Sequence, residues 1–269
     1  MNTIEKISNL NLSKGGNQMK KTIKMIVMTM VAIITVSSIN VVACSAASKK
    51  NYKVPSHIVT GEDISVGEMK YKGWDQAISY KGNHTTFTGG EGMIKDFTYM
   101  NNNRYNYKYK YYATTLNSAT IKTKKDRVVL IKGKGDTGEK YTTKFYYKGG
   151  KLYKTVEKWT YSKKSEYKTS KIVEKIKTDK HGNLKKQIIT SKSIMRDGSI
   201  DKNKEMYKYK NIYSGKYIKK AKTTRYFRID GKWKKDTVNI VRFKYRNVRL
   251  TKSQYTRYKP IINYIMLHY

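Results

Sequence analysis

The histidines and acidic residues are the side chains that could do chemistry, and their spacing matches no catalytic motif. The four histidines are far apart in the sequence: His57, His84, His181 and His268. The sequence contains no H-x-x-x-H metal motif, no G-x-S-x-G nucleophile motif and no G-x-x-x-x-G-K-[ST] phosphate loop. The single cysteine excludes an intramolecular disulfide and any cysteine-based zinc or iron–sulfur site. We therefore expect no cofactor and no metal, and a protein that is not an enzyme.

Two alternatives to this expectation stay open. The polar segment 81–86 contains His84 beside Gly82 and reads either as a small site or as a glycine-flanked surface turn. A pair of carboxylates could hydrolyse sugars, because paired carboxylates are the core of that reaction. The candidates for such a pair, which could equally form salt bridges with nearby lysines, are Glu62, Asp63, Glu68, Asp75, Glu91 and Asp96.

Regularly spaced turns divide residues 101–269 into the strands that would position any site there. Turns are predicted about every 15 to 18 residues, and Asp-Gly and Gly-Gly pairs favour two-residue hairpins because both positions tolerate φ > 0. The predicted turns are centred near Lys134-Gly135, Gly149-Gly150, Lys163-Lys164, His181-Gly182, Asp197-Gly198, Ser214-Gly215 and Asp230-Gly231. Aspartates at or near these turns are expected for backbone reasons. The intervals predict strands of about 10 to 12 residues in an all-β antiparallel meander.

Alternating side chains indicate that the sheet has one apolar face and one wet face. In segment 104–111, tyrosines occupy every second position and Arg, Asn and Lys occupy the others. Because side chains alternate along a strand, the tyrosines share one face. Segments 207–210 and 241–246 repeat the pattern. We predict that the sheet covers its apolar face by curving into a half-barrel, by packing on residues 48–100 or by holding an apolar ligand. The apolar C-terminal segment 261–267 is expected to pack as a last strand or helix.

Residues 48–100 differ from the rest in composition. They contain seven glycines between Gly61 and Gly92 and are near neutral, with seven lysines and six acidic residues. We predict loops and short strands here, with a helical turn near Trp74–Ala77. Residues 101–269 contain 46 basic and 12 acidic residues, so most of the formal charge of +39 belongs to the predicted meander.

This charge predicts the kind of partner. A strongly cationic surface attracts polyanions and releases their counterions. Lysines number 49 against 9 arginines. AT-rich codons explain the preference for lysine but not the scarcity of acids. Lysine favours diffuse attraction, whereas arginine favours bidentate recognition. The predicted polyanion-binding residues lie on the wet face: Arg104, Lys108, Lys110, Lys208, Lys210, Arg242, Lys244 and Arg246.

The N-terminal residues resemble a bacterial export signal. Lysines at 20, 21 and 24 precede an apolar run over 25–36, and small residues follow to Ala47. This order is typical of a secretory signal peptide over 19–47. A membrane anchor requires about 20 mostly apolar residues, and this run is shorter and interrupted by Ser, Thr and Asn. Residues 1–18 are expected to be untranslated leader, with Met19 as the start, or an extended charged region of the signal.

The segment Val41-Val42-Ala43-Cys44 resembles a bacterial lipobox, although the family more often has Leu and Ser or Ala at the two valine positions. The resemblance implies lipidation of Cys44, and two acyl chains would anchor the protein stably. Small residues at 44–47 also suit ordinary signal peptidase, so a freely secreted protein stays open. We expect an extracellular or cell-envelope location in either case.

Three functions compete at this point. The first is a non-catalytic envelope protein that binds an anionic wall polymer or anionic lipid surface, and DNA without sequence preference. The second is a carrier of a lipid or other apolar ligand on the Tyr/Phe/Ile face of a half-barrel. The third is a secreted enzyme with a site in residues 48–100.

Overall fold

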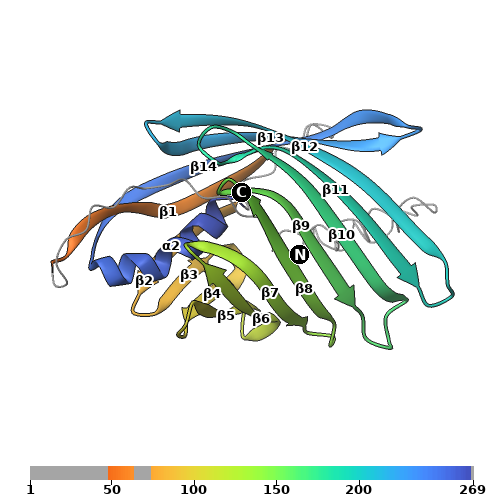
Figure 1. Cartoon of the computed structure of the whole chain (residues 1–269), viewed down its shortest axis with the longest axis horizontal. Coiled ribbons are helices and arrows are strands. Elements are labelled where there is room, and N and C mark those ends of the chain that lie inside the picture. The colour runs from red at the N-terminus through yellow and green to blue at the C-terminus, as the bar shows by residue number, and fades with distance from the viewer. Residues whose placement is uncertain (1–47, 64–73, 268–269) are drawn as a thin grey trace, which may run out of the picture.

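The computed structural model describes residues 48–63 and 74–267. These residues form fourteen β-strands, one short 3-10 helix and one α-helix (Figure 1). The elements are β1 (Lys50–Asp63), β2 (Trp74–Lys81), β3 (His84–Thr88), η2 (Gly90–Gly92), β4 (Met93–Tyr99), β5 (Arg104–Tyr111), β6 (Thr114–Lys124), β7 (Arg127–Gly135), β8 (Lys140–Lys148), β9 (Lys151–Thr160), β10 (Tyr167–Thr178), β11 (Leu184–Met195), β12 (Ile200–Ser214), β13 (Tyr217–Ile229), β14 (Lys232–Leu250) and α2 (Lys252–Met266).

The strands form an antiparallel meander that closes into a barrel. Each strand pairs with the next along the chain, and β1 pairs with β14 to complete the ring. The closing pair runs from Lys50 opposite Leu250 to Asp63 opposite Val238. The predicted meander is confirmed, but the predicted curved sheet or half-barrel is wrong. Closure gives each described strand a partner strand on both sides, and strands left at an unpaired edge are a hazard for aggregation.

The region before residue 101 contains the predicted short strands, since β2, β3 and β4 have 8, 5 and 7 residues, but it also contains a long strand that was not predicted. Its described residues form β1 to β4, and β1 alone is 14 residues long. Trp74 begins β2 and is not part of a helical turn. Glycines misled the prediction here, because they mark turns and bulges in a barrel as readily as loops. These strands belong to the same barrel as residues 101–269, since β4 pairs with β5.

The predicted turns fall within a few residues of the hairpin turns. Gly149 and Gly150 both have positive φ, 54° and 82°, between the paired residues Lys148 and Lys151. Asp230 and Gly231 do the same, at 49° and 76°. Both pairs therefore have the left-handed backbone that matches the strand twist in a two-residue hairpin. The later strands exceed the predicted length, and β14 reaches 19 residues.

The alternation of side chains places the core inside the ring. On β5, Tyr105 and Tyr107 are buried, at 3% and 4% exposure, whereas Arg104, Asn106 and Lys108 are exposed. The same two-residue period separates an inner and an outer face on β8 and β10. The wet face of the predicted meander is thus the outer wall of the barrel.

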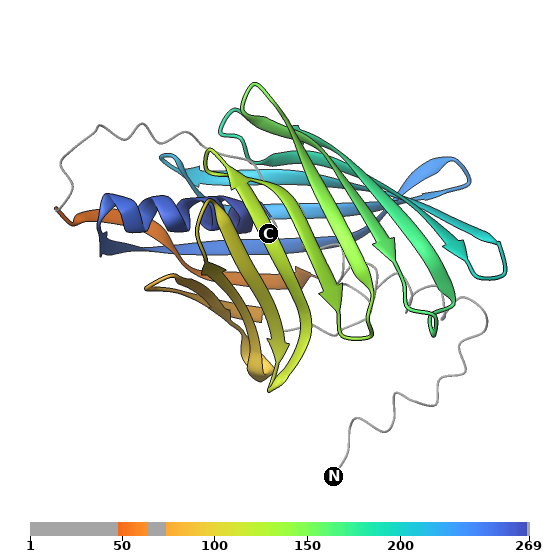
Figure 2. The ribbon, with the colours of Figure 1, turned by 60° about the horizontal axis from the view of Figure 1, so that its bottom comes forward.

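Helix α2 lies inside the barrel wall, and Figures 1 and 2 show it beside β1 and β14. Thr251 caps its N-terminus, where a capping box joins Thr251 and Gln254. Ile261, Tyr264 and Ile265 pack into the same core cluster as inward residues of the strands. The C-terminal segment is therefore a helix, one of the two predicted alternatives. Within the described ranges, no helix has the length and hydropathy required to cross a membrane.

Candidate functional site

The outer wall contains the basic residues that the sequence singled out. Seven of the eight are exposed, and Lys110 is half-buried: Arg104, Lys108, Lys110, Lys208, Lys210, Arg242, Lys244 and Arg246. The barrel does not gather them into one patch. They lie on β5, β12 and β14, and β5 and β12 are separated by six strands in the sheet order. These residues belong to a charged wall and not to a compact pocket.

Inside the barrel lies a polar group that sequence reasoning missed, beginning with Glu157 on β9. Its side chain is buried and accepts a hydrogen bond from Thr143 Oγ1 on β8 at 2.7 Å. Trp159 Nε1 donates to its other oxygen at 2.5 Å. Burial raises the pKa of Glu157 from 4.5 to about 7, although both hydrogen bonds act to lower it. This carboxyl group therefore exchanges its proton near neutral pH.

Glu174 lies on the neighbouring strand β10 and is also buried, at 1% exposure. Thr155 Oγ1 on β9 donates to Glu174 Oε2 at 2.6 Å. Burial raises the pKa of Glu174 well above 4.5, and the negative charge of Glu157 raises it further. On the far side, Tyr209 donates to Gln187 Oε1 at 2.7 Å, and Gln187 in turn hydrogen-bonds Glu174. The two glutamates and their partners thus extend across β8 to β12.

The surroundings of this glutamate pair determine its charge. Among the described residues, no lysine or arginine contributes to the pKa of Glu157 or Glu174. Tyr264 from α2 is close enough for both glutamates to raise its pKa. Two like charges without a cation are costly in a low-dielectric interior, so at most one of the pair ionises easily near neutral pH. The pair therefore retains at least one proton near neutral pH, although the protein as a whole is cationic.

A third buried glutamate is neutralised by a cation. Glu205 on β12 lies 3.0 Å from Nη2 of Arg225 on β13, and Arg225 Nε donates to its other oxygen at 3.2 Å. Tyr207 donates to Glu205 at 2.7 Å. Arg225 also lies 3.6 Å from Asp236 and over the ring of Phe227. This bidentate pair ties β12, β13 and β14 together.

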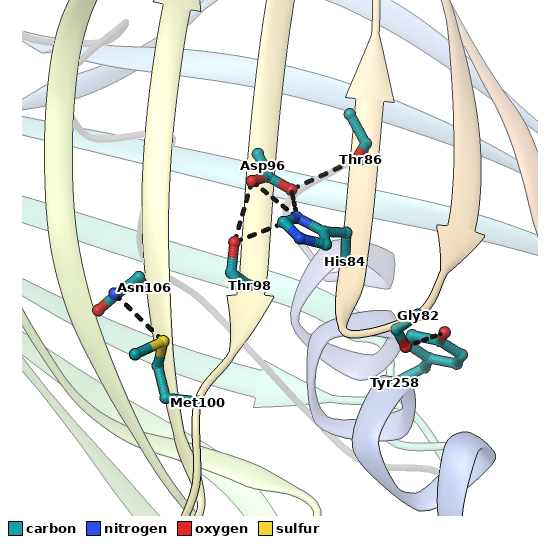
Figure 3. Close-up of polar contacts among 8 residues, drawn as sticks. All are labelled: Gly82, His84, Thr86, Asp96, Thr98, Met100, Asn106 and Tyr258. Atoms are coloured by element: carbon teal, nitrogen blue, oxygen red, sulfur yellow. Dashed lines mark hydrogen bonds and ion pairs between the residues drawn. The ribbon is translucent and has the colours of Figure 1, made fainter.

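The polar segment 81–86 forms a small cluster on the outer wall (Figure 3). His84 Nδ1 lies 3.1 Å from the Asp96 carboxylate on β4, and Thr98 Oγ1 donates to Asp96 at 3.0 Å. Thr86 donates to the same carboxylate at 3.3 Å. The imidazole is half exposed, with 52% of its side chain accessible. Its contacts orient the ring, and the arrangement matches the predicted surface turn followed by a strand.

The carboxylates proposed for sugar hydrolysis do not form a pair in the described part of the chain. Asp75 is exposed on β2, whereas Asp96 on β4 pairs with His84, and β3 separates the two strands. Glu68 and the side chains of Glu62, Asp63 and Glu91 lie outside the described residues. The histidines are also apart, since His181 packs on Tyr213 in the β10–β11 turn and His57 is on β1. His268 lies outside the described residues.

Several aspartates serve the backbone, as the sequence predicted. Asp197 accepts from the Ser199 backbone N–H at 2.8 Å in the β11–β12 turn. Asp126 and Asp230 have positive φ in their hairpins. In the described ranges, no group of three His, Cys, Asp or Glu side chains could hold a metal ion. Cys44 and the signal segment 19–47 lie outside these ranges.

Comparison with known proteins gives little beyond this description. No family model and no curated protein matches the sequence. One solved structure that resembles it is a porin-like protein from Bacteroides uniformis, which is 10% identical in sequence. The alignment covers 71% of this chain and 98% of that chain, with a TM-score of 0.36. At this level of similarity, the function of the chain must be inferred from its own residues.

Proposed function

We propose that this protein is exported, has no catalytic role and binds anionic polymers or anionic surfaces through the lysine-rich outer wall of its barrel. The observation behind the proposal is the direction of the side chains. On β10, Lys171, Lys175 and Lys177 are exposed while the alternate residues are buried. Neighbouring strands repeat this arrangement, so cationic side chains cover a broad curved surface. Such a surface concentrates polyanions and releases their counterions.

The same outer wall supports a barrel that faces water. A barrel wall in contact with lipid needs an apolar band about 25 Å tall, and lysine at its midplane costs about 2–4 kcal/mol. The interior is the apolar side here, with residues such as Ile58, Ile131 and Leu152 fully buried. The distribution is thus the reverse of a lipid-facing barrel. If the protein is held at a membrane, the lipobox-like Cys44 is the proposed attachment.

The carrier hypothesis is the weaker alternative. Helix α2 places Ile261, Tyr264 and Ile265 against the inward aromatic residues that would hold an apolar ligand. Tyr264 lies 5.9 Å from Phe97, centroid to centroid, in an edge-to-face contact. The chain's own helix therefore takes the place of a ligand along this part of the interior. That contact supports the binder over the carrier.

A salt titration tests the proposal. Affinity for a polyanion such as duplex DNA should fall steeply with salt, with a slope of log affinity on log salt near −0.9 for each phosphate contacted. The affinity of the mature protein for immobilised DNA and for a teichoic polymer is measured between low and physiological salt. Binding that ignores salt, or no binding at low salt, contradicts the proposal. A saturable, salt-independent affinity for a fatty acid would instead favour the carrier.

A further inference from the structure

Four lysines on the outer wall face one another across four consecutive strands. Lys158 on β9 is directly opposite Lys171 on β10, and Lys171 is opposite Lys192 on β11. Lys192 is in turn opposite Lys202 on β12. All four side chains are exposed. We call Lys158, Lys171, Lys192 and Lys202 the lysine row; it crosses the strands at right angles in the part of the wall where Figures 1 and 2 show β9 to β12 side by side.

No acidic side chain of these strands neutralises the row. The four acidic residues of β9 to β12 all fall in the opposite, inward register: Glu157, Glu174, Asp201 and Glu205. Glu157, Glu174 and Glu205 are buried, and Asp201 is exposed but is opposite the buried Ser193 on the inward register. Residues opposite each other in an antiparallel pair share a face, so the acids lie on the other side of the sheet from the lysines.

The row is unfavourable for the folded protein on its own. Like charges directly opposite each other in an antiparallel pair are destabilising. The row contains three such pairs in succession. On β5, by contrast, Lys108 is opposite an acid, Asp96, whereas other lysine pairs of the barrel, such as Lys186 and Lys208, do not continue across four strands. An arrangement that repeats the unfavourable pair across four strands calls for negative charge from outside the chain.

The geometry points to the shape of that partner. Neighbouring strands are about 4.8 Å apart, so the row presents one ammonium group per strand over about 14 Å. Flexible lysine stems allow each group to follow a phosphate in a chain with a similar repeat. The row extends toward β7, because Thr142 is opposite Lys158 and Lys132 is opposite Thr142. It therefore follows the curve of the wall.

We propose that the lysine row binds a flexible, linear polymer of phosphate groups that lies across β9 to β12, perpendicular to the strands. This inference rests on the proposed function and assigns it a place and an orientation. A flexible chain can follow the curved wall and meet every lysine of the row. Duplex DNA has a persistence length near 50 nm, so it remains straight over this span and meets fewer of them.

Two matched pairs of substitutions test the inference. Lys171→Glu with Lys192→Glu reverses the centre of the row, and Lys163→Glu with Lys164→Glu makes the same change of charge at two exposed lysines of the β9–β10 turn, outside the row. Binding of the mature protein to long-chain inorganic polyphosphate is measured over a range of salt. The row variant should lose about tenfold or more in affinity, and its salt slope should fall by about 1.4, the value for two phosphates of a single-stranded polymer. The control should lose no more than about threefold.

A variant with uncharged side chains controls for misfolding. Lys171→Gln with Lys192→Gln removes like charges, so it should raise the midpoint of thermal unfolding at low salt and still weaken binding. If wild-type protein does not bind polyphosphate at low salt, the proposed function fails and the row fails with it. Equal losses in the row variant and the control leave polyanion binding intact and overturn the row. Tighter binding of duplex DNA than of polyphosphate, per phosphate, overturns the assignment to a flexible polymer.

Discussion

Trp159 Nε1 donates a hydrogen bond to Glu157 Oε1 at 2.5 Å, and both side chains are buried inside the barrel. The two residues are neighbours on the inner face of β9, because alternate residues of a strand share a face. The indole N–H stabilises the carboxylate, yet burial still raises the pKa of Glu157 to about 7. Their contact connects the protonation of a core residue to a fluorescent side chain.

Stability should depend on pH through this carboxyl group. The unfolded chain releases the proton near pH 4.5, whereas the pKa of Glu157 in the folded barrel is about 7. Between these values the folded state binds more protons, so the stabilisation is complete below pH 4.5 and is lost as pH rises through 7. One proton over this window corresponds to at most about 3 kcal/mol. The raised pKa of Glu174 acts in the same direction.

Urea unfolding at pH 5, 7 and 8 measures this dependence. Glu157→Gln keeps the shape of the side chain without its titration, so its stability should change less with pH than that of wild type. A wild-type stability that rises from pH 5 to pH 8 would show that the carboxyl group is ionised in the fold at low pH.

Gly133 should not tolerate a larger residue. It is opposite Tyr141, and a Cβ at position 133 would lie 2.3 Å from the tyrosine ring. The ring cannot move freely, because it stacks on Trp159 and its hydroxyl donates to Asn117 at 2.9 Å. We expect Gly133→Ala to destabilise the barrel by about 1–3 kcal/mol, the usual cost of overpacking.

The matched control for this change is Gly90→Ala. A Cβ at Gly90 would meet no atom within 4 Å. Its urea midpoint should stay close to that of wild type, with the same dependence of stability on urea. Equal stability of the two variants would mean that Tyr141 does not lie over Gly133 in solution.

Helix α2 should be held in place by hydrogen bonds to the turns. Tyr258 donates to the Gly82 carbonyl at 2.6 Å, a contact visible in Figure 3. Tyr258→Phe removes only this bond, so we expect a loss of about 1 kcal/mol, measured by urea unfolding. Tyr112→Phe removes a hydroxyl group from a side chain that is 64% exposed and should be neutral. If Tyr258→Phe leaves the stability unchanged, Tyr258 does not donate this hydrogen bond to Gly82 in solution.

Cys44 is the proposed point of attachment to the membrane. Substitution of Cys44 by Ala should move a lipidated protein from the membrane fraction to the medium, because its acyl chains supply the anchoring. A protein cut by ordinary signal peptidase should fractionate alike with and without the cysteine. The mass of the native N-terminal peptide is the second measurement, since a diacylated cysteine adds the mass of its lipid.

Local patterns sufficed to predict much of the meander. Gly149 and Gly150 marked a hairpin because their backbone preference is a property of the two residues alone. The alternation around Tyr105 and Tyr107 separated inner from outer faces in the same way. By contrast, the glycine-rich region before residue 101 was predicted as loops and short strands, and the 14-residue β1 was missed because its local signal is weak. Pairing partners compensate for that weakness in the fold.

The candidate sites show the same difference between what local sequence patterns predict and what strand pairing decides. The sequence identified lysine as the outward residue, and it predicted a negatively charged partner. It did not show that Lys171 faces both Lys158 and Lys192, because opposition across strands depends on register. The inward position of Glu174 was readable from its alternation with Lys171 and Lys175. This inward position was not predicted, because a glutamate among lysines ordinarily forms salt bridges at the surface.

The sequence by itself therefore determined the meander of residues 101–269, its turns and the charge of its wet face, since each depends on residues close together in the chain. Only the tertiary structure decided that Lys50 would meet Leu250 and close the ring, because the pairing of β1 with β14 joins residues at opposite ends of the described chain. Closure then decided the rest. It turned one face of the meander into an interior where burial raises the pKa of Glu157 and Glu174, and the other into a cationic wall.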